Sequence, residues 1–394
     1  MTERAKILLL LTSLHGGGAE KVAVHLLNKM DKARFDVRMG LLRGSGPWLA
    51  GADQGRIIIA PDSERFNFDG ANQDNYRPGR LFHTITGAPR AFRRMVKGVQ
   101  PDVVMSFLKG TNIAVWGALM GLGAARPRWI AREGNNTLAV IDEEVGNSAG
   151  RALVRRVTIR AYRRADIVLA NSIDMGDSLV TDLGIPESRV RVIENPLDLN
   201  EIRALATEPL PDRPARPFLL TAGRFEYQKA HDVLLRAFAQ STTRSSHDLV
   251  ILGKGSLDEP TRALAAELGL GDRVHFPGFT ANPHAWTARA DLFVLPSRWE
   301  GFPTAAAEAI AVGTPALLTD CRFGARDVLE HGASGWLTPV DDVGALAGAI
   351  DRLIRCPIER ARLGTAGAWR AHRFGLAEIL PRYEALFAEQ AGRR

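Results

Sequence analysis

Residues 300–315 read EGFPTAAAEAIAVGTP, and this stretch carries the pattern from which the second half of the chain is predicted. An apolar run, Asp291 to Leu295, precedes it and has the composition of a buried strand. The Gly-Phe-Pro at 301–303 predicts a tight turn. The alanines that follow predict a helix, because alanine is the best helix former. The order strand, glycine turn, helix is typical of an α/β unit.

Two glutamates, Glu300 and Glu308, lie eight positions apart in this stretch. A turn that leads into a helix aims unpaired backbone N–H groups and the positive end of the helix dipole at one point, which suits a phosphate. Carboxylates beside that point are strong acceptors for the hydroxyls of a sugar and a ribose. The pattern favours a nucleotide-sugar site. The alternative is two ordinary glutamates, one before a turn and one on an amphipathic helix.

A second segment, residues 217–229, reads PFLLTAGRFEYQK. An apolar strand at Phe218–Thr221 ends in Gly223 and Arg224, and Lys229 follows five residues later. The glycine lets the backbone turn closely, and the two cations can neutralise a diphosphate.

A third segment lies at the amino terminus, where the apolar run 5–14 leads into a glycine loop that contains Gly17 and Gly18. We predict a strand, a loop and a helix here. A signal peptide is the alternative, but the apolar core is short and no clean cleavage site follows. The loop also resembles a dinucleotide-binding fingerprint, although consecutive glycines do not have the G-x-G-x-x-G spacing.

These segments together resemble the retaining glycosyltransferases of family 4, whose signature is two glutamates separated by seven residues, the first followed by Gly-Phe. The resemblance implies the GT-B fold: two Rossmann-like, doubly wound α/β domains that face a central cleft. It also implies that Arg224 and Lys229 hold the donor pyrophosphate and stabilise it as it leaves. Glu308 is then expected to accept hydrogen bonds from the ribose hydroxyls.

The remaining donor contacts follow from the same resemblance. Glu300 is expected to hold the donor sugar, Lys254 and Phe279 to lie near the base, and the amino-terminal glycine loop to face the phosphates. Retaining members are thought to use the donor phosphate as base, so we name no enzymic nucleophile. The chain has no Asp-x-Asp motif, and we expect neither a metal nor a cofactor. The backbone positions assigned to donor binding are Gly17, Gly18, Gly223, Gly301, Phe302, Pro303 and Thr304.

The acceptor side is less clearly marked. Many relatives place a histidine on the first domain, and here the corresponding stretch offers Arg132, Glu133 and Asn135 instead. We expect these three residues to take its place near the acceptor; an ordinary strand-end loop is the alternative. Asp320-Cys321 and the stretch 324–327 resemble a loop of amino-sugar transferases that extend polyprenyl-linked glycans. The resemblance implies a glycan or polyprenyl-linked acceptor.

The net charge of +7 lies wholly in residues 1–200, which hold 28 Lys and Arg against 21 Asp and Glu. Two basic clusters, 77–97 and 151–164, contribute most of it and have helical character. Such helices bind anionic membrane surfaces or a lipid-linked pyrophosphate. A solvated face is the alternative, and nucleic acid is disfavoured because aromatic residues do not interleave with the cations. The candidates are Arg90, Arg93, Arg94, Arg156, Arg160 and Arg163.

A chain of 394 residues is long enough for two domains. We predict a first domain over 1–207, a proline-rich linker over 208–217 and a second domain over 218–375, with a last helix at about 376–394 that crosses back to the first. Only two cysteines are present, which fits a reducing cytoplasm. No apolar run approaches the ~18–20 residues of a membrane helix. The expected location is cytoplasmic, peripheral at the inner face of the membrane.

The predicted function is retaining transfer of a hexose or N-acetylhexosamine from a nucleoside-diphosphate sugar, on frequency a UDP-sugar, to a glycan or lipid-linked hydroxyl in cell-surface polysaccharide or glycolipid synthesis. A nicotinamide oxidoreductase needs an acid about 20 residues after the glycines. Asp36 is near that distance, but an oxidoreductase leaves Glu300 and Glu308 unexplained. Three more classes stay open: a non-catalytic glycan- or nucleotide-binding protein, a basic membrane-surface adaptor and an inverting GT-B transferase.

Overall fold

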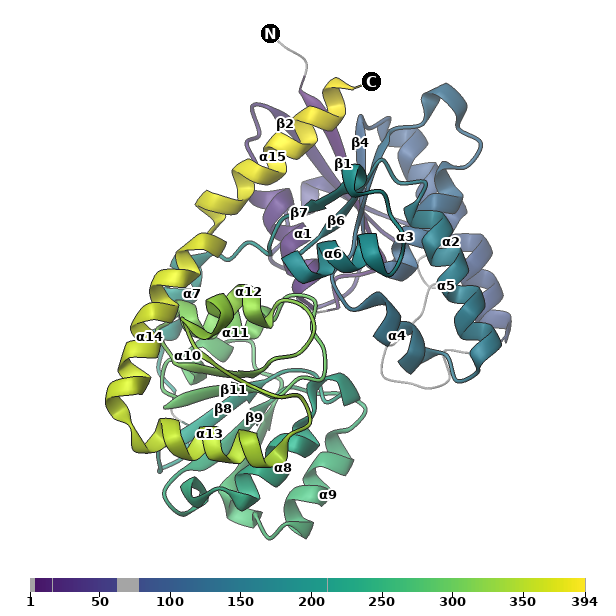
Figure 1. The fold of residues 1–394 in the computed structure, drawn as a ribbon. Coiled ribbons are helices and arrows are strands. Elements are labelled where there is room, and N and C mark those ends of the chain that lie inside the picture. The colour runs from purple at the N-terminus through teal and green to yellow at the C-terminus, as the bar shows by residue number, and fades with distance from the viewer. Residues whose placement is uncertain (1–3, 16, 62–77, 211, 394) are drawn as a thin grey trace. The chain divides into compact units, whose positions relative to one another are not determined.

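The computed structural model describes residues 4–15, 17–61, 78–210 and 212–393, and the side chains of 78–86 lie outside that description (Figure 1). The chain divides into two compact units, Met1–Pro196 with Ile379–Arg394, and Leu197–Glu378. Each unit is built on a parallel sheet with helices on both faces. The predicted α/β class with two doubly wound sheets is confirmed.

The sheet of the first unit has the strand order β3-β2-β1-β4-β5-β6-β7. Its strands are β1 (Ala5–Leu11), β2 (Phe35–Leu41), β3 (Ile57–Ile59), β4 (Val103–Phe107), β5 (Arg128–Arg132), β6 (Ile167–Ala170) and β7 (Val190–Val192). Its helices are α1 (Gly18–Lys29), α2 (Pro78–Val99), α3 (Lys109–Leu119), α4 (Thr137–Glu144), α5 (Ser148–Tyr162), α6 (Ile173–Thr181) and most of α15 (Leu376–Gly392).

The sheet of the second unit has the order β10-β9-β8-β11-β12-β13. Its strands are β8 (Phe218–Ala222), β9 (Asp248–Leu252), β10 (Val274–Gly278), β11 (Leu292–Leu295), β12 (Ala316–Thr319) and β13 (Trp336–Thr338). Its helices are α7 (Leu199–Ala206), α8 (His231–Gln240), α9 (Asp258–Glu267), α10 (Pro283–Thr287), α11 (Thr304–Ala311), α12 (Ala325–Leu329), α13 (Val343–Arg355) and α14 (Pro357–Ala371).

The central strands β4, β8 and β11 are largely apolar because both faces of each sheet are covered. In β8, Phe218 and Leu220 join the core that contains the alanines of α11, whereas Leu219 joins the core that contains Leu234 of α8. Successive side chains of a strand point to opposite faces, so one short run supplies both cores. This is why the strands could be located from the sequence.

The order of strands reverses beside β1 in the first sheet and beside β8 in the second. In open parallel sheets, ligands bind outside the carboxyl ends of the strands at such a switch point. In the second unit, Gly223 and Arg224 directly follow β8, and the turn that carries Glu300 follows its neighbour β11. The topology therefore places the predicted donor residues at the position where a ligand site is expected.

The chain passes between the units after Pro196 and after Glu378. The first boundary differs from the predicted one at 207, since α7 belongs to the second unit. Leu197 and Ile202 are buried in the core that also holds α11, so hydrophobic packing and not the later prolines sets the boundary. The backbone of Leu197 hydrogen-bonds to Phe374 and Leu376, which holds the two crossing segments side by side.

From Ile379 onwards, α15 belongs to the first unit. Tyr383 and Phe387 are fully buried in that unit's core. At the helix surface Arg382 hydrogen-bonds to Glu194, and Glu384 pairs with Arg34 at 3.0 Å. Within the described residues, no helix combines the length and the apolar character needed to cross a bilayer.

Candidate functional site

The turn that carries Lys229 and the turn that carries Glu300 lie side by side in the second unit. Lys229 Nζ is 2.5 Å from Glu300 Oε1. The side-chain amide of Gln228 donates to the carbonyl of Trp299 at 2.8 Å, and the backbone N–H of Arg298 donates to the carbonyl of Gln228 at 2.8 Å. Two segments far apart in the sequence are thus joined, and Lys229 contacts Glu300, two residues that were predicted to belong to one site.

Glu300 is held in a buried position. Only 5% of the residue is exposed, and the same Oε1 atom accepts a second hydrogen bond from Ser297 Oγ at 2.6 Å. A buried carboxylate is costly unless it is paired and hydrogen-bonded. Lys229 and Ser297 together satisfy this requirement. Sequence reasoning missed Ser297, because a single hydroxyl after an apolar strand carries no signal of its own.

Gly223 leaves room for the side chain of Lys229. A Cβ atom at this position would stand 3.3–3.4 Å from the Cγ, Cδ and Cε atoms of Lys229, closer than most such contacts. A side chain here would therefore require the lysine side chain to shift by a few tenths of an ångström. Arg224, the next residue, is exposed and its side chain has no hydrogen-bonding partner in the part of the chain that the structure describes. Its guanidinium is free to bind an anion.

The loops after β8, β9 and β10 meet at one edge of the sheet. The N–H of Gly223 donates to Leu252 at 3.0 Å, and that of Gly253 donates to Gly278 at 2.9 Å. Gly253 has φ +139°, and a Cβ atom there would lie 1.9 Å from the carbonyl oxygen of Gly223, so only glycine fits. Lys254 and Phe279 extend this edge as exposed side chains, Phe279 with 59% of its surface free.

The loop that precedes α12 packs closely against the turn 301–303. Gly324 has φ +75°, and a Cβ atom there would lie 2.6 Å from the carbonyl oxygen of Gly301. Phe302 is buried edge-on against Phe374, with ring centroids 5.2 Å apart. The predicted helix after the turn is α11, which begins at Thr304 without a side-chain cap. Its first backbone N–H groups are not satisfied by a capping side chain.

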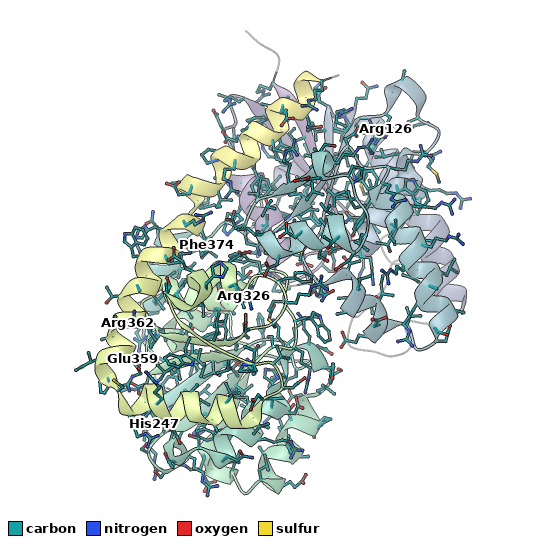
Figure 2. All side chains as sticks on the ribbon, in the orientation of Figure 1. Arg126, His247, Arg326, Glu359, Arg362 and Phe374 are labelled. Atoms are coloured by element: carbon teal, nitrogen blue, oxygen red, sulfur yellow. The ribbon has the colours of Figure 1, made fainter. Side chains whose placement is uncertain are left out.

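Arg326, in the first turn of α12 and labelled in Figure 2, makes a two-pronged ion pair with Asp320, with both N–O distances 2.7 Å. The hydrogen bond and charge of Arg326 lower the pKa of Asp320. The segment 320–327, which resembles a loop of amino-sugar transferases, is thus held in place by this ion pair next to the turn 301–303. Glu308 is half-buried on the second turn of α11, and its ribose contact stays a prediction.

The acceptor role predicted for Arg132 is not compatible with its environment. The residue is fully buried at the end of β5, where it donates to Asn195 Oδ1 at 2.5 Å and to the hydroxyl of Tyr383 at 3.3 Å. It also lies over the ring of Phe107. Arg132 therefore holds the last helix in the first unit instead of reaching toward a ligand.

Glu133 is likewise committed within its unit. It is 2% exposed and accepts from the backbone N–H groups of Gly134, at 2.9 Å, and Asn135, at 3.3 Å. Its other oxygen accepts from the hydroxyl of Tyr162; burial and the charge of Glu133 raise the pKa of that tyrosine well above its usual value. The predictions for Arg132 and Glu133 are wrong because both side chains satisfy buried partners. Asn135 is half-buried, and its role stays a prediction.

At the first switch point, α1 begins at Gly18 with Gly17 as its N-cap, so the predicted strand, loop and helix are present. The oxidoreductase alternative requires an acid at the carboxyl end of β2. Asp36 instead lies near the amino end of β2, where it pairs with Arg38 at 3.3 Å and Arg56 at 3.8 Å. It is therefore at the wrong edge of the sheet for a nucleotide ribose.

One of the predicted membrane-binding arginines of α2 has a structural role. Arg93 donates to the carbonyl groups of Gly117, Ala118 and Met120 at the end of α3, where helix carbonyls lack partners. Arg93 therefore caps α3, and its membrane contact stays a prediction. Arg90 and Arg94 are exposed on the same helix. Arg77 and the side chain of Arg80, also in the predicted cluster, lie outside the described residues.

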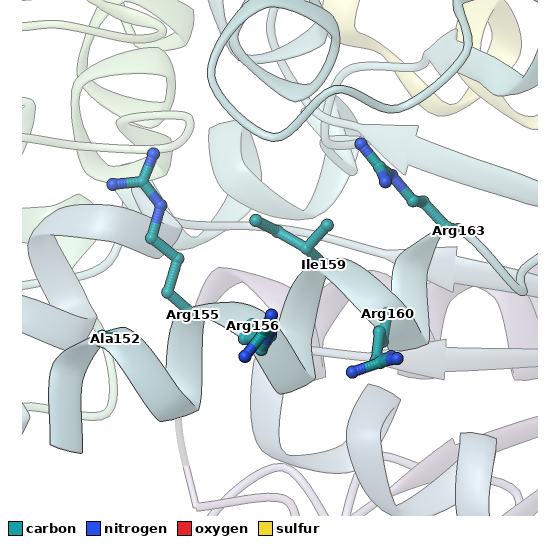
Figure 3. Close-up of a pocket in the computed structure, with 6 residues that line it drawn as sticks. All are labelled: Ala152, Arg155, Arg156, Ile159, Arg160 and Arg163. Carbon is teal, nitrogen blue, oxygen red and sulfur yellow. The ribbon is translucent and has the colours of Figure 1, made fainter. Parts of the chain in front are cut away.

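On α5 the cations surround a hollow of about 430 Å³. Figure 3 shows two rows along the helix, with Arg155, Ile159 and Arg163 in one and Arg156 and Arg160 in the other. Arg163 donates to Gly184 at 3.2 Å and Arg155 to Asp182 at 3.4 Å. Arg156 and Arg160 are exposed, and no partner for either is found among the described residues.

The residues of α5 do not divide into one buried apolar face and one exposed cationic face. Leu153 is 62% exposed, at the border of the cationic face, whereas Thr158 and Ala161 are fully buried. The hydroxyl of Thr158 bonds to the carbonyl of Val154, which allows a polar residue on the packed face. An exposed leucine next to these exposed arginines gives α5 both an apolar and a cationic contact surface.

His231 beneath the lysine turn leads to a pH prediction. Burial, and then the charge of Lys229, lower its pKa from 6.5 to about 4. Because the folded protein binds this proton less readily than the unfolded chain, the stabilisation is complete above pH 6.5 and is lost as pH falls toward 4. The loss is about 3 kcal/mol. Urea unfolding of wild type and His231→Gln between pH 7 and 4 should show a steeper loss in wild type; equal slopes would contradict the assignment.

Two family descriptions match the chain. Residues 206–369 match "Glycosyl transferases group 1", and residues 16–201 match "Glycosyltransferase Family 4". Among curated proteins, an N-acetylgalactosaminyltransferase of Campylobacter jejuni that acts on an undecaprenol-diphosphate-linked amino sugar is 26% identical over 378 residues, 95% of this chain and 97% of the relative. A D-inositol 3-phosphate glycosyltransferase of Xylanimonas cellulosilytica is 29% identical over 83% of this chain and 81% of its own.

Solved structures with the same fold cover both whole chains. Sucrose-phosphate synthase of Thermosynechococcus elongatus superposes with a TM-score of 0.79 at 21% identity, over 99% of this chain and 100% of that one. The Anabaena protein HepE in complex with UDP-glucose gives 0.74 at 20% identity over 99% and 100%. The fold and the site thus define a GT-B enzyme. The chain belongs to the family 4 glycosyltransferases and is a glycosyltransferase that uses a nucleotide sugar.

Proposed function

We propose that this enzyme transfers a hexose or N-acetylhexosamine, with retention of anomeric configuration, from a UDP-sugar to a hydroxyl of a polyprenyl-linked or cell-surface glycan. The observation that carries the proposal is the contact between Lys229 and Glu300 beside Gly223 and Arg224, at the switch point of the second sheet. Cations and a buried carboxylate at the carboxyl end of parallel strands suit a sugar diphosphate.

The chemistry follows from the charges. In the transfer, the bond between the sugar's C1 and the diphosphate oxygen breaks, and the acceptor oxygen bonds to C1 on the same face. The acceptor proton passes to an oxygen of the departing diphosphate. Arg224 and Lys229 would stabilise the negative charge that develops there, and fixed charges of this kind are usually the largest catalytic effect. Glu300 would hold the lysine through Oε1 and leave Oε2 for a hydroxyl of the sugar.

The assignments of the donor base and of the acceptor class rest on similar proteins. HepE is described in complex with UDP-glucose, and the Campylobacter relative is named for transfer of an N-acetylamino sugar to an undecaprenol-diphosphate-linked acceptor. These descriptions support uridine as the base and a lipid-linked glycan as the acceptor. We further propose that the enzyme works at the cytoplasmic face of the membrane.

The cationic face of α5 would contact anionic lipid there, with Arg156 and Arg160 as the charged contacts and Leu153 as the apolar one. Each arginine near such a surface contributes roughly 1 kcal/mol, so the double change Arg156→Ala/Arg160→Ala should weaken partitioning into phosphatidylglycerol vesicles by about 30-fold. Vesicle sedimentation measures this. Arg236→Ala, an exposed arginine of α8, is the control. Equal partitioning of the double variant and wild type would show that α5 is only solvated.

The transfer itself is tested with radiolabelled UDP-glucose, UDP-galactose and their N-acetylamino counterparts, together with polyprenyl-diphosphate-linked saccharides. The expected result is a labelled, chloroform-extractable product whose new linkage is α by NMR when the donor is α. Lys229→Met is the inactive control. A β-linked product would establish inversion. If no lipid is labelled and the UDP-sugar labels free saccharides instead, the acceptor is a soluble glycan.

A further inference from the structure

Ser297 occupies a position that the proposed mechanism does not yet explain. It lies just after β11, is 1% exposed, and donates its hydroxyl proton to Glu300 Oε1 at 2.6 Å. This is the same oxygen that Lys229 Nζ contacts at 2.5 Å. One carboxylate oxygen is therefore fixed from two directions, by a neutral hydroxyl on the sheet side and by a cation on the opposite turn.

Ser297 is itself held by the neighbouring strand. Thr319, the last residue of β12, donates from Oγ1 to the carbonyl oxygen of Ser297 at 2.5 Å. Thr319 is 1% exposed, so neither hydroxyl exchanges freely with water. A continuous series of buried contacts thus runs from the end of the sheet through Ser297 and Glu300 to the ammonium of Lys229. Buried polar groups with every partner satisfied make a site rigid.

Burial next to this series also affects a thiol. Cys321 is 4% exposed, and burial followed by the charge of Glu300 raises its pKa to about 12. The thiol therefore stays neutral and places no second negative charge beside the carboxylate of Glu300. The carboxylate charge is left for Ser297 and the lysine.

We propose that Ser297 is a positioning residue, which fixes the carboxylate of Glu300 so that Lys229 is directed at the donor diphosphate, and that Thr319 fixes Ser297 in turn. The proposal rests on the proposed function of the site. Without the hydroxyl, the carboxylate can rotate about its last bond and the lysine it holds can move with it. A displacement of about 1 Å from the productive geometry costs up to 10²-fold in rate.

The first test compares Ser297→Ala with Ser241→Ala. Ser241 is also 1% exposed and donates its hydroxyl to a carboxylate, Asp351 Oδ1 at 2.5 Å, elsewhere in the same unit. The two variants therefore lose the same group from the same kind of contact. We expect Ser297→Ala to lower kcat about 10-fold, with KM for the donor changed less than about twofold, and Ser241→Ala to leave kcat unchanged. Melting temperatures of the two should fall similarly.

A second test asks whether the effect passes through Glu300. In a Glu300→Gln background, Ser297→Ala should lower kcat by less than about twofold, because the carboxylate that it positions is already gone. Thr319→Val, which removes the hydroxyl, should lower kcat. Thr319→Ser, which keeps the hydroxyl, should have a kcat close to that of wild type. The control for Thr319→Val is Thr314→Val, whose buried hydroxyl donates to the carbonyl of Thr287 at 2.7 Å.

The outcomes are distinct. An active wild type whose Ser297→Ala variant behaves like Ser241→Ala would overturn the positioning role and leave the transferase function intact. Equal losses in kcat for Ser297→Ala with and without Glu300 would also overturn it, because the serine would then act by another route. A wild-type protein that releases no UDP from any donor would overturn the proposed function and the positioning role with it.

Discussion

Replacing Lys229 by methionine is expected to lower kcat by about 10²–10³-fold, since loss of one fixed donor to a developing negative charge typically costs this much. Methionine keeps the length of the side chain over Gly223 and removes only the ammonium. The change also leaves the buried carboxylate of Glu300 with a weaker set of partners. The free energy of unfolding of the Lys229→Met variant should therefore be about 1–3 kcal/mol lower than that of wild type. Initial rates of UDP release and urea unfolding measure the two effects.

A double change, Lys229→Met with Glu300→Gln, separates charge loss from catalysis. The glutamine removes the stranded charge, so stability should recover toward wild type while kcat stays low. If kcat also recovers, the lysine serves folding alone and its place in the reaction is wrong. The comparison is informative because the two side chains touch, and neighbours that share a contact are not expected to be additive.

Arg224→Ala is expected to lower kcat by about 10–10²-fold without loss of stability. The arginine is exposed and its side chain has no partner in the described structure, so folding does not depend on it. A charge-assisted contact to the departing diphosphate is worth about 1.5–3 kcal/mol, which corresponds to a factor of roughly 10–10². Steady-state kinetics with a saturating donor, together with thermal unfolding, tests both expectations.

Arg236→Ala is the matched control, because Arg236 is also an exposed arginine of the second unit. It should leave kcat and stability unchanged. If Arg224→Ala were as active as Arg236→Ala, the guanidinium would have no part in leaving-group stabilisation, and the diphosphate site would have to lie elsewhere. Together, the lysine and arginine variants distinguish a cation built into the fold from one presented to solvent.

Much of the fold was predictable because the strands of a doubly wound sheet are buried on both faces and stand out as apolar runs. β13 carries a weaker signal, since Trp336–Thr338 has only three residues and two of them are half-buried. The domain boundary was misplaced because prolines mark irregular backbone, whereas α7 is fixed by the packing of Ile202. Side-chain burial across elements is not visible in a local pattern.

The candidate site was predictable where charge and glycine coincide with strand ends. Gly223, Lys229 and Glu300 met as expected because parallel strands bring their carboxyl ends to one edge. Arg132 was misjudged, since a charged side chain looks the same in sequence whether it faces solvent or donates to buried partners inside the protein. Ser297 went unseen because its importance comes wholly from its contact with Glu300.

Binding of a nucleotide sugar by the second unit is best tested by a thermal-shift comparison of wild type and Glu308→Ala with UDP-, GDP- and ADP-sugars. A ligand present at about 100 times its dissociation constant raises the free energy of unfolding by about 2.7 kcal/mol. For a unit of this size, the melting temperature then rises by roughly 5–10 °C. The expected result is a shift with UDP-sugars alone that is lost in Glu308→Ala. If no nucleotide sugar shifts the melting temperature of wild type, the second unit is not a donor site and the proposed transfer is wrong.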